Sequence, residues 1–69
     1  MSYRDTLINF AAAVIETARE MKQPIPTNIL YVAAQQKGIN YEDFNKLLEI
    51  LIKGGKIKRA DMPHHIEAV

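Results

Sequence analysis

The residues with the clearest potential for chemistry lie between positions 41 and 64, on a predicted helix and the hairpin that follows it. A 3.6-residue repeat turns a set of polar side chains outward on the helix, and a cluster of cations comes just after it. Such groups bind phosphate oxygens and the edges of bases. The candidate nucleic-acid-binding residues are Tyr41, Asn45, Lys46, Lys53, Lys56, Lys58, Arg59 and His64.

The outward face of this helix permits two interpretations. Asn45 and Lys46 can meet base edges or phosphates in a major groove, and Tyr41 can stack or donate a hydrogen bond. Against this, Glu42 and Glu49 place carboxylates where phosphates would lie. The chain has nine basic and eight acidic residues, a net charge of +1, whereas dedicated DNA-binding domains are strongly basic. A solvated or protein-binding face is therefore the favoured interpretation, with groove reading left open.

The cation cluster of Lys56, Lys58 and Arg59 is the best candidate for contact with a nucleic-acid backbone, because phosphate binding requires only well-placed positive charge. The alternative is that these charges protect the edge of a hairpin from aggregation. The sequence leaves both interpretations open.

Metal binding and catalysis find no support in the residue pattern. His64 and His65 are adjacent, and neighbouring side chains on a strand point to opposite faces, so the two imidazoles cannot coordinate the same metal ion. Histidine changes charge near neutral pH, so contacts made by His64 are expected to be mildly pH-dependent. There is no glycine-rich phosphate loop, no serine elbow and no H-E-x-x-H pattern. We expect no catalytic residue, no cofactor, no metal and no small-molecule substrate.

Three helices are expected to position the candidate residues, and the first runs from about Ser2 to Lys22. Ser2 followed by Asp5 has the form of a capping box. Apolar residues recur with the spacing of one buried face. They are Leu7, Phe10, Ala11, Val14, Ala18 and Met21.

The segment 23–27 interrupts the helical pattern with a proline on each side of Ile25. The backbone there is expected to be extended, with Ile25 buried in a very short edge strand. Thr27 or Asn28 is expected to cap a second helix that runs from about Asn28 to Lys37. Its expected buried residues are Ile29, Leu30, Val32 or Ala33, and Ala34.

Gly38 is expected just past the end of the second helix, with Ile39 pointing inward in the turn that follows. The third helix begins with Asn40 as its cap and Asp43 three residues on, and Gly54-Gly55 ends it. Its apolar stripe is the strongest periodic signal in the chain. The stripe consists of Phe44, Leu47, Leu48 and Leu51, widened by Ile50 and Ile52.

Two strands are expected at 56–60 and 64–69, joined by a turn at 61–63 and with Ile57 and Ile66 pointing inward. Helices followed directly by a hairpin predict a mainly α fold of the winged helix-turn-helix class. It has three helices, a short β-hairpin wing and a third very short strand near Ile25. Residues 1–69 are expected to form a single domain.

The amino-acid composition bears on the cellular compartment of the protein. The chain has no cysteine, and its longest apolar run, residues 10–15, is far short of the roughly 20 residues that cross a bilayer. No signal-peptide pattern opens the sequence. We expect a cytoplasmic protein with no membrane partner.

Beyond these patterns, the chain resembles a known family in the order and spacing of several short motifs. The motifs are Ile29-Leu30, Ala34-Gln35-Gln36, Gly38-Ile39, Asn45-Lys46-Leu47-Leu48-Glu49, Gly54-Gly55-Lys56-Ile57 and a short wing that contains Pro63. Together they resemble the C-terminal winged-helix domain of archaeal MCM replicative helicases, over nearly the whole chain. The resemblance implies a monomeric, non-catalytic accessory domain that modulates helicase activity through weak contacts with DNA, mainly its phosphates, or with replication proteins. The Walker motifs and arginine finger of the parent helicase are absent from this chain.

Two alternatives of other classes stay open. A small dimeric winged-helix transcription regulator would need a spare apolar face, which Ile8, Ala12 and Ile15 of the first helix can supply. A winged helix that docks only to proteins would make no DNA contact. Sedimentation separates the dimeric regulator from a monomeric module.

Overall fold

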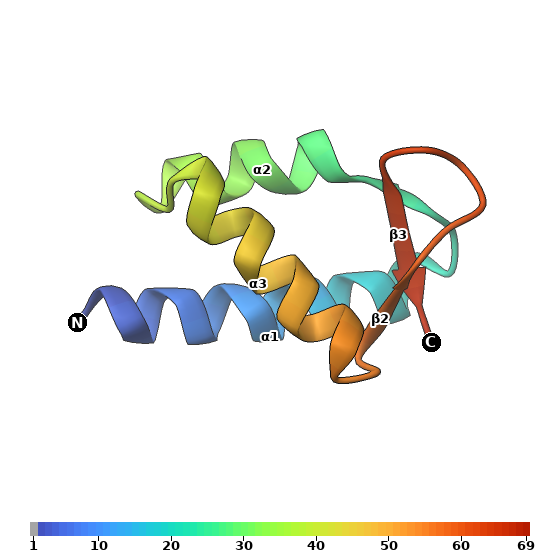
Figure 1. Cartoon of the computed structure of the whole chain (residues 1–69), viewed down its shortest axis with the longest axis horizontal. Coiled ribbons are helices and arrows are strands. Elements are labelled where there is room, and N and C mark those ends of the chain that lie inside the picture. Colours follow the sequence, from blue (N-terminus) through green and yellow to red (C-terminus); the bar gives the residue numbers. More distant parts are fainter. Residues whose placement is uncertain (1) are drawn as a thin grey trace.

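The computed structural model describes residues 2–69 as three helices and a small antiparallel sheet (Figure 1). The helices are α1 (Tyr3–Met21), α2 (Thr27–Gln36) and α3 (Tyr41–Lys53). The strands are β1 (Ile25–Pro26), β2 (Ile57–Arg59) and β3 (His65–Ala68). β3 lies in the middle of the sheet, in the order β1-β3-β2. This architecture confirms the predicted winged helix-turn-helix class, including the short strand at Ile25.

The helices and the wing meet around α3. Figure 1 shows α1 and α2 on opposite sides of the molecule, with α3 crossing between them and the wing at one end. α3 contacts α1, α2 and β2, while α1 also packs against β3. None of the helices in residues 2–69 is both long enough and apolar enough to cross a membrane.

The predicted helix starts of α1 and α3 are confirmed by hydrogen bonds. The Ser2 hydroxyl accepts from the Asp5 amide at 3.2 Å, and Asn40 Oδ1 accepts from the Asp43 amide at 2.8 Å. Each cap satisfies one of the first-turn N–H groups that have no partner within the helix.

The predicted helix ends are confirmed at Gly38 and Gly55, which take φ values of 83° and 72°. Such left-handed backbone favours glycine, which has no Cβ to clash. The amides of Ile39 and Lys56 then bond back to carbonyls five residues earlier, at 3.0 and 2.9 Å. These bonds close both helices and turn Ile39 into the core.

The predicted cap of α2 is wrong. The helix begins at Thr27 with Pro26 in the cap position, and no side chain caps it. The Thr27 hydroxyl donates instead to the carbonyl of His64 at 3.2 Å, and the Thr27 amide bonds the same oxygen at 2.9 Å. The carbonyl oxygen of His64 in the wing loop thus accepts a hydrogen bond from the first amide of α2, and this bond links the loop to the helix.

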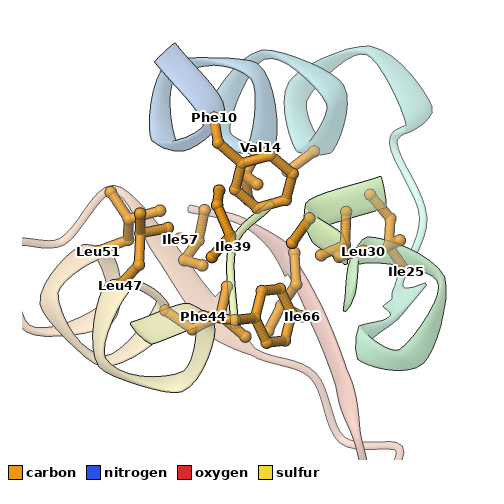
Figure 2. Close-up of a cluster of buried hydrophobic side chains, with 13 residues drawn as sticks. Phe10, Val14, Ile25, Leu30, Ile39, Phe44, Leu47, Leu51, Ile57 and Ile66 are labelled. Carbon is orange, nitrogen blue, oxygen red and sulfur yellow. The ribbon is translucent and has the colours of Figure 1, made fainter. Parts of the chain in front are cut away.

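The core gathers residues from all three helices and all three strands (Figure 2). The predicted α3 stripe is buried, as are the predicted inward residues of the segments between and after the helices. The core consists of Phe10, Val14, Ala18, Ile25, Leu30, Ala34, Ile39, Phe44, Leu47, Leu48, Leu51, Ile57 and Ile66. In Figure 2, Phe10 and Val14 of α1 point toward the cluster that contains Ile39.

Three predicted buried positions are wrong: Ile50 is 69% exposed, Ile29 59% and Met21 48%. Of the alternatives Val32 and Ala33, Ala33 is the one that packs half-buried against the core, and Val32 is 52% exposed. Each helix of this small protein is covered on one side only, so apolar residues beside the central stripe stay at the surface. The buried face is therefore narrower than the apolar pattern indicates.

The wing strands are shorter than predicted. β2 and β3 begin one residue later, and end one residue earlier, than the predicted 56–60 and 64–69. His64 has φ 59°, a left-handed conformation that cannot continue a strand, so it belongs to the loop. The Ala60 amide bonds the His65 carbonyl at 3.0 Å and closes the wing.

Candidate nucleic-acid interface

Three of the eight candidate residues meet in one hollow between α3, the start of α2 and the wing loop. Tyr41 and Asn45 line it from α3, and His64 lines it from the loop. The hollow has a volume of about 500 Å³, and no carboxylate lines it. Its remaining lining residues are Pro26, Thr27, Asn28, Tyr31, Phe44, Pro63 and His65. It offers aromatic faces and amide groups, the features that stack on and hydrogen-bond to bases.

Two contacts hold the walls of this hollow together. The ring of Tyr31 in α2 meets the ring of Tyr41 edge to face, with centroids 5.0 Å apart. This geometry is favourable for aromatic pairs. On the opposite wall, the two bonds from Thr27 fix the carbonyl of His64.

Tyr31 and Thr27 were missed as site residues in the sequence. The apolar periodicity assigns Tyr31 to the body of α2, and the structure places it half-buried at the edge of the core. The signal that identifies it is the amphipathic character of tyrosine, which buries its ring and leaves the hydroxyl at the surface. Thr27 carries no such signal, because its contact with His64 lies 37 residues away in the chain.

The predicted cation cluster of the wing is divided between the two faces of β2. Side chains alternate along a strand, so Arg59 shares a face with the buried Ile57, and Lys58 points to the other face. Arg59 therefore reaches α3, where its guanidinium forms an ion pair with Glu49. It lines a second hollow of about 180 Å³ beside Asn45 and His64.

A second candidate cation is also paired. The ammonium of Lys46 lies 3.4 Å from the carboxylate of Glu42, one turn earlier on α3. The two acidic residues that oppose phosphate binding are thus each matched by a candidate cation. The outward face of α3 is close to neutral as a result, which disfavours strong attraction of DNA to it.

The remaining three candidates form what we call the lysine strip, Lys53, Lys56 and Lys58. Lys53 ends α3, Lys56 follows the glycine turn, and Lys58 stands on β2. All three are exposed, and none forms an ion pair with another residue among positions 2–69. Glu67 is the register partner of Lys58 on β3 and moderates the local charge.

The two histidines do not act as a pair. His64 is exposed in the loop, whereas His65 begins β3 and its Nδ1 lies 2.8 Å from the carbonyl oxygen of Pro63. Among the described residues there is no group of three or more His, Cys, Asp or Glu able to hold a metal ion.

Neither protein-family models, nor curated proteins, nor solved structures give a match to this chain.

Proposed function

We propose that this chain is a non-catalytic winged-helix accessory module that contacts DNA weakly, through phosphates rather than bases. The observation that carries the proposal is the distribution of cations. Lys46 and Arg59 are paired with carboxylates around α3, whereas the lysine strip forms no ion pair within residues 2–69 and follows α3 into the wing. Unpaired surface lysines supply phosphate contact without sequence information.

The hollow at Tyr41, Asn45 and His64 belongs to the same proposal as a secondary contact. It lies on the wing side of α3 and shares Thr27, Asn45 and His64 with the smaller hollow beside Arg59. A sugar or an unstacked base that enters it meets aromatic faces, which bind bases with little sequence preference. Phosphate contact by the lysine strip would give the affinity, and the hollow would orient the strand.

The biological setting of the proposal rests on the resemblance to the C-terminal domain of archaeal MCM replicative helicases. In that setting the module is a cytoplasmic, monomeric attachment to an ATPase, and it modulates unwinding through DNA and replication proteins. The ATPase chemistry would belong to the parent helicase.

The test compares two double variants by fluorescence anisotropy with labelled duplex and single-stranded DNA across a range of salt concentrations. Lys56→Gln/Lys58→Gln is expected to weaken binding and to reduce the slope of log affinity against log salt by nearly two, since each phosphate contact contributes roughly 0.9 for duplex DNA. Arg19→Gln/Lys37→Gln removes the same charge from exposed positions on and after other helices and is the matched control. Equal losses of DNA affinity in the two variants would mean that DNA is attracted by the overall positive charge and not by the lysine strip, and would overturn the proposal.

A second candidate function, docking to a protein without DNA contact, is favoured by a different observation. Ile8 on α1 and Ile50 on α3 are both more than half exposed. The dimeric regulator is tested separately by sedimentation, where a stable dimer would support it and a monomer would support the accessory module.

A further inference from the structure

An apolar groove of about 370 Å³ runs between α1 and α3. Its apolar lining is Leu7, Ile8, Ala11, Leu47, Ile50 and Leu51. Leu47 and Leu51 belong to the core and form the floor, while Ile8 and Ile50 stand at the surface, 55% and 69% exposed. The groove is therefore an opening onto the core with an isoleucine on each of its two helices.

Ile8 and Ile50 line the same groove, whereas the exposed Ile29, Val32 and Met21 do not line it. A domain of 69 residues needs nearly all its apolar side chains inside to be stable. Because they are 55% and 69% exposed, neither Ile8 nor Ile50 contributes its full apolar burial to the stability of this fold. Contiguous exposed apolar surface of this kind marks sites of protein interaction.

The charges around the groove are matched unequally. Arg4 lines it and forms no ion pair with another residue among positions 2–69. Asp43, also in the lining, accepts a hydrogen bond from the Tyr3 hydroxyl at 2.6 Å. Along α3 a further hollow contains Ile50 and leads to Lys53, which is also without an ion pair in this part of the chain. Asp43 keeps its negative charge, and Lys46, which also lines the groove, is paired with Glu42. The charged side chains in the lining are therefore two cations, Arg4 and Lys46, and one carboxylate, Asp43, so the lining has a small positive excess.

We propose that the α1–α3 groove binds an amphipathic helix of a partner protein, whose apolar ridge is flanked by acidic residues. A groove between two helices fits the ridge that side chains at i, i+3, i+4 and i+7 form on a third helix. Glutamates or aspartates beside that ridge meet Arg4 and Lys53. Apolar burial supplies the affinity, and the acidic flanks supply the orientation.

A second copy of this chain is a poor occupant. A two-fold dimer places the same patch against itself. Two grooves facing each other leave a void instead of interlocking, and they bring two copies of Arg4 and Lys53 onto one surface. The groove needs a convex partner of opposite charge.

This inference goes beyond the proposed DNA contact, because it uses another side of α3. Tyr41 and Asn45 face the wing hollow, whereas Leu47 and Ile50 face α1. Lys53 is common to both proposals, but the apolar lining of the groove contains no residue of the lysine strip. Loss of peptide binding in Ile50→Ser therefore tests the groove without testing the DNA contact.

The experiment is an amide chemical-shift titration of the ¹⁵N-labelled chain with two synthetic helical peptides. Both carry leucines at i, i+3, i+4 and i+7; one has glutamates beside the leucines and the other has lysines there. The acidic peptide is expected to shift residues of the groove and to bind at least tenfold more tightly than the basic peptide. Absent shifts, shifts centred on α2, or equal binding of the two peptides would overturn the proposal.

Two matched variants and one sedimentation run complete the test. Ile50→Ser is expected to lower the affinity for the acidic peptide about tenfold. Ile29→Ser lies at an exposed α2 position outside the groove lining and is expected to leave this affinity unchanged. Because both sites are at the surface, both variants are expected to fold, which the amide spectra check. Equal effects of the two variants contradict the proposal. So does a dimer that Ile50→Ser dissociates, since it would make a second copy the occupant.

Discussion

Arg59 on the wing strand β2 is paired with Glu49 on α3, so the cation that points toward this helix is neutralised within the protein. The pair forms because β2 turns Arg59 to the same face as Ile57, whose side chain enters the core next to α3. Exposed ion pairs of this kind contribute about 0–1 kcal/mol to stability. Their larger effect is on the field that a charged ligand meets.

Glu49→Gln should therefore raise affinity for DNA while changing stability by less than about 1 kcal/mol. The substitution removes a negative charge and releases Arg59, so the salt slope should steepen by roughly one. Glu16→Gln makes the same charge change on the exposed face of α1 and should leave the slope unchanged. Salt-dependent anisotropy measures both, and a slope for Glu49→Gln equal to that of the parent chain would contradict this account.

The difference between Ile66 and Ile50 should appear directly in stability. Ile66 is fully buried and Ile50 is 69% exposed. Ile66→Val should lower the free energy of unfolding by about 0.5–1.5 kcal/mol, because it removes a buried methylene and leaves a cavity. Ile50→Val makes the same chemical change and should stay within about 0.5 kcal/mol. Urea denaturation measures both free energies, and comparable losses would show that Ile50 packs like a core residue.

The caps of α3 and α2 should respond differently to alanine. Asn40→Ala removes the acceptor of the Asp43 amide and should cost roughly 1 kcal/mol. Asn28→Ala should stay within about 0.5 kcal/mol, since α2 begins before Asn28 and no side chain caps it. Thermal and urea unfolding both test this contrast. A larger loss at Asn28 than at Asn40 would mean that α2 is capped in the way the sequence suggests.

The Tyr3 hydroxyl donates to the carboxylate of Asp43, and this bond raises the pKa of Tyr3 above its usual value. Ionisation would lose the bond and set a phenolate beside a carboxylate. The stabilisation is thus complete below the ordinary tyrosine pKa and is lost as pH rises through the higher folded-state pKa. Asp43→Asn should bring the pKa of Tyr3 back toward its usual range, measured from the ring signals in an NMR pH titration. An unchanged titration in that variant would contradict the assigned cause.

Helix boundaries followed from the sequence wherever the controlling contact is local. Asn40 and its cap partner are three residues apart, and Gly38 and Gly55 act on the turns in which they lie. The stripe of α3 was equally predictable, because its period is set by the helix itself. The start of α2 was not, since it depends on a bond from Thr27 to a carbonyl 37 residues away.

The candidate interface was predictable only in its residue types. Tyr41, Asn45 and His64 were correctly expected at the surface, but their meeting in one hollow depends on how the wing loop folds against α2. The pairing of Arg59 with Glu49 depends on which face of β2 turns inward. Likewise, the exposure of Ile50 depends on how much of α3 its neighbours cover, which a periodic pattern does not contain.

In the proposed function, the main contact with DNA is made by the lysine strip at the end of α3 and on the wing, and not by Asn45 and Lys46 earlier on α3. The most direct measurement is an amide chemical-shift titration of the labelled chain with duplex and single-stranded DNA, at low and at moderate salt. We predict shifts centred on Lys53, Lys56 and Lys58 that fade as salt rises. An absence of shifts at low salt would contradict the claim, and so would shifts centred on Asn45 and Lys46 that persist at moderate salt.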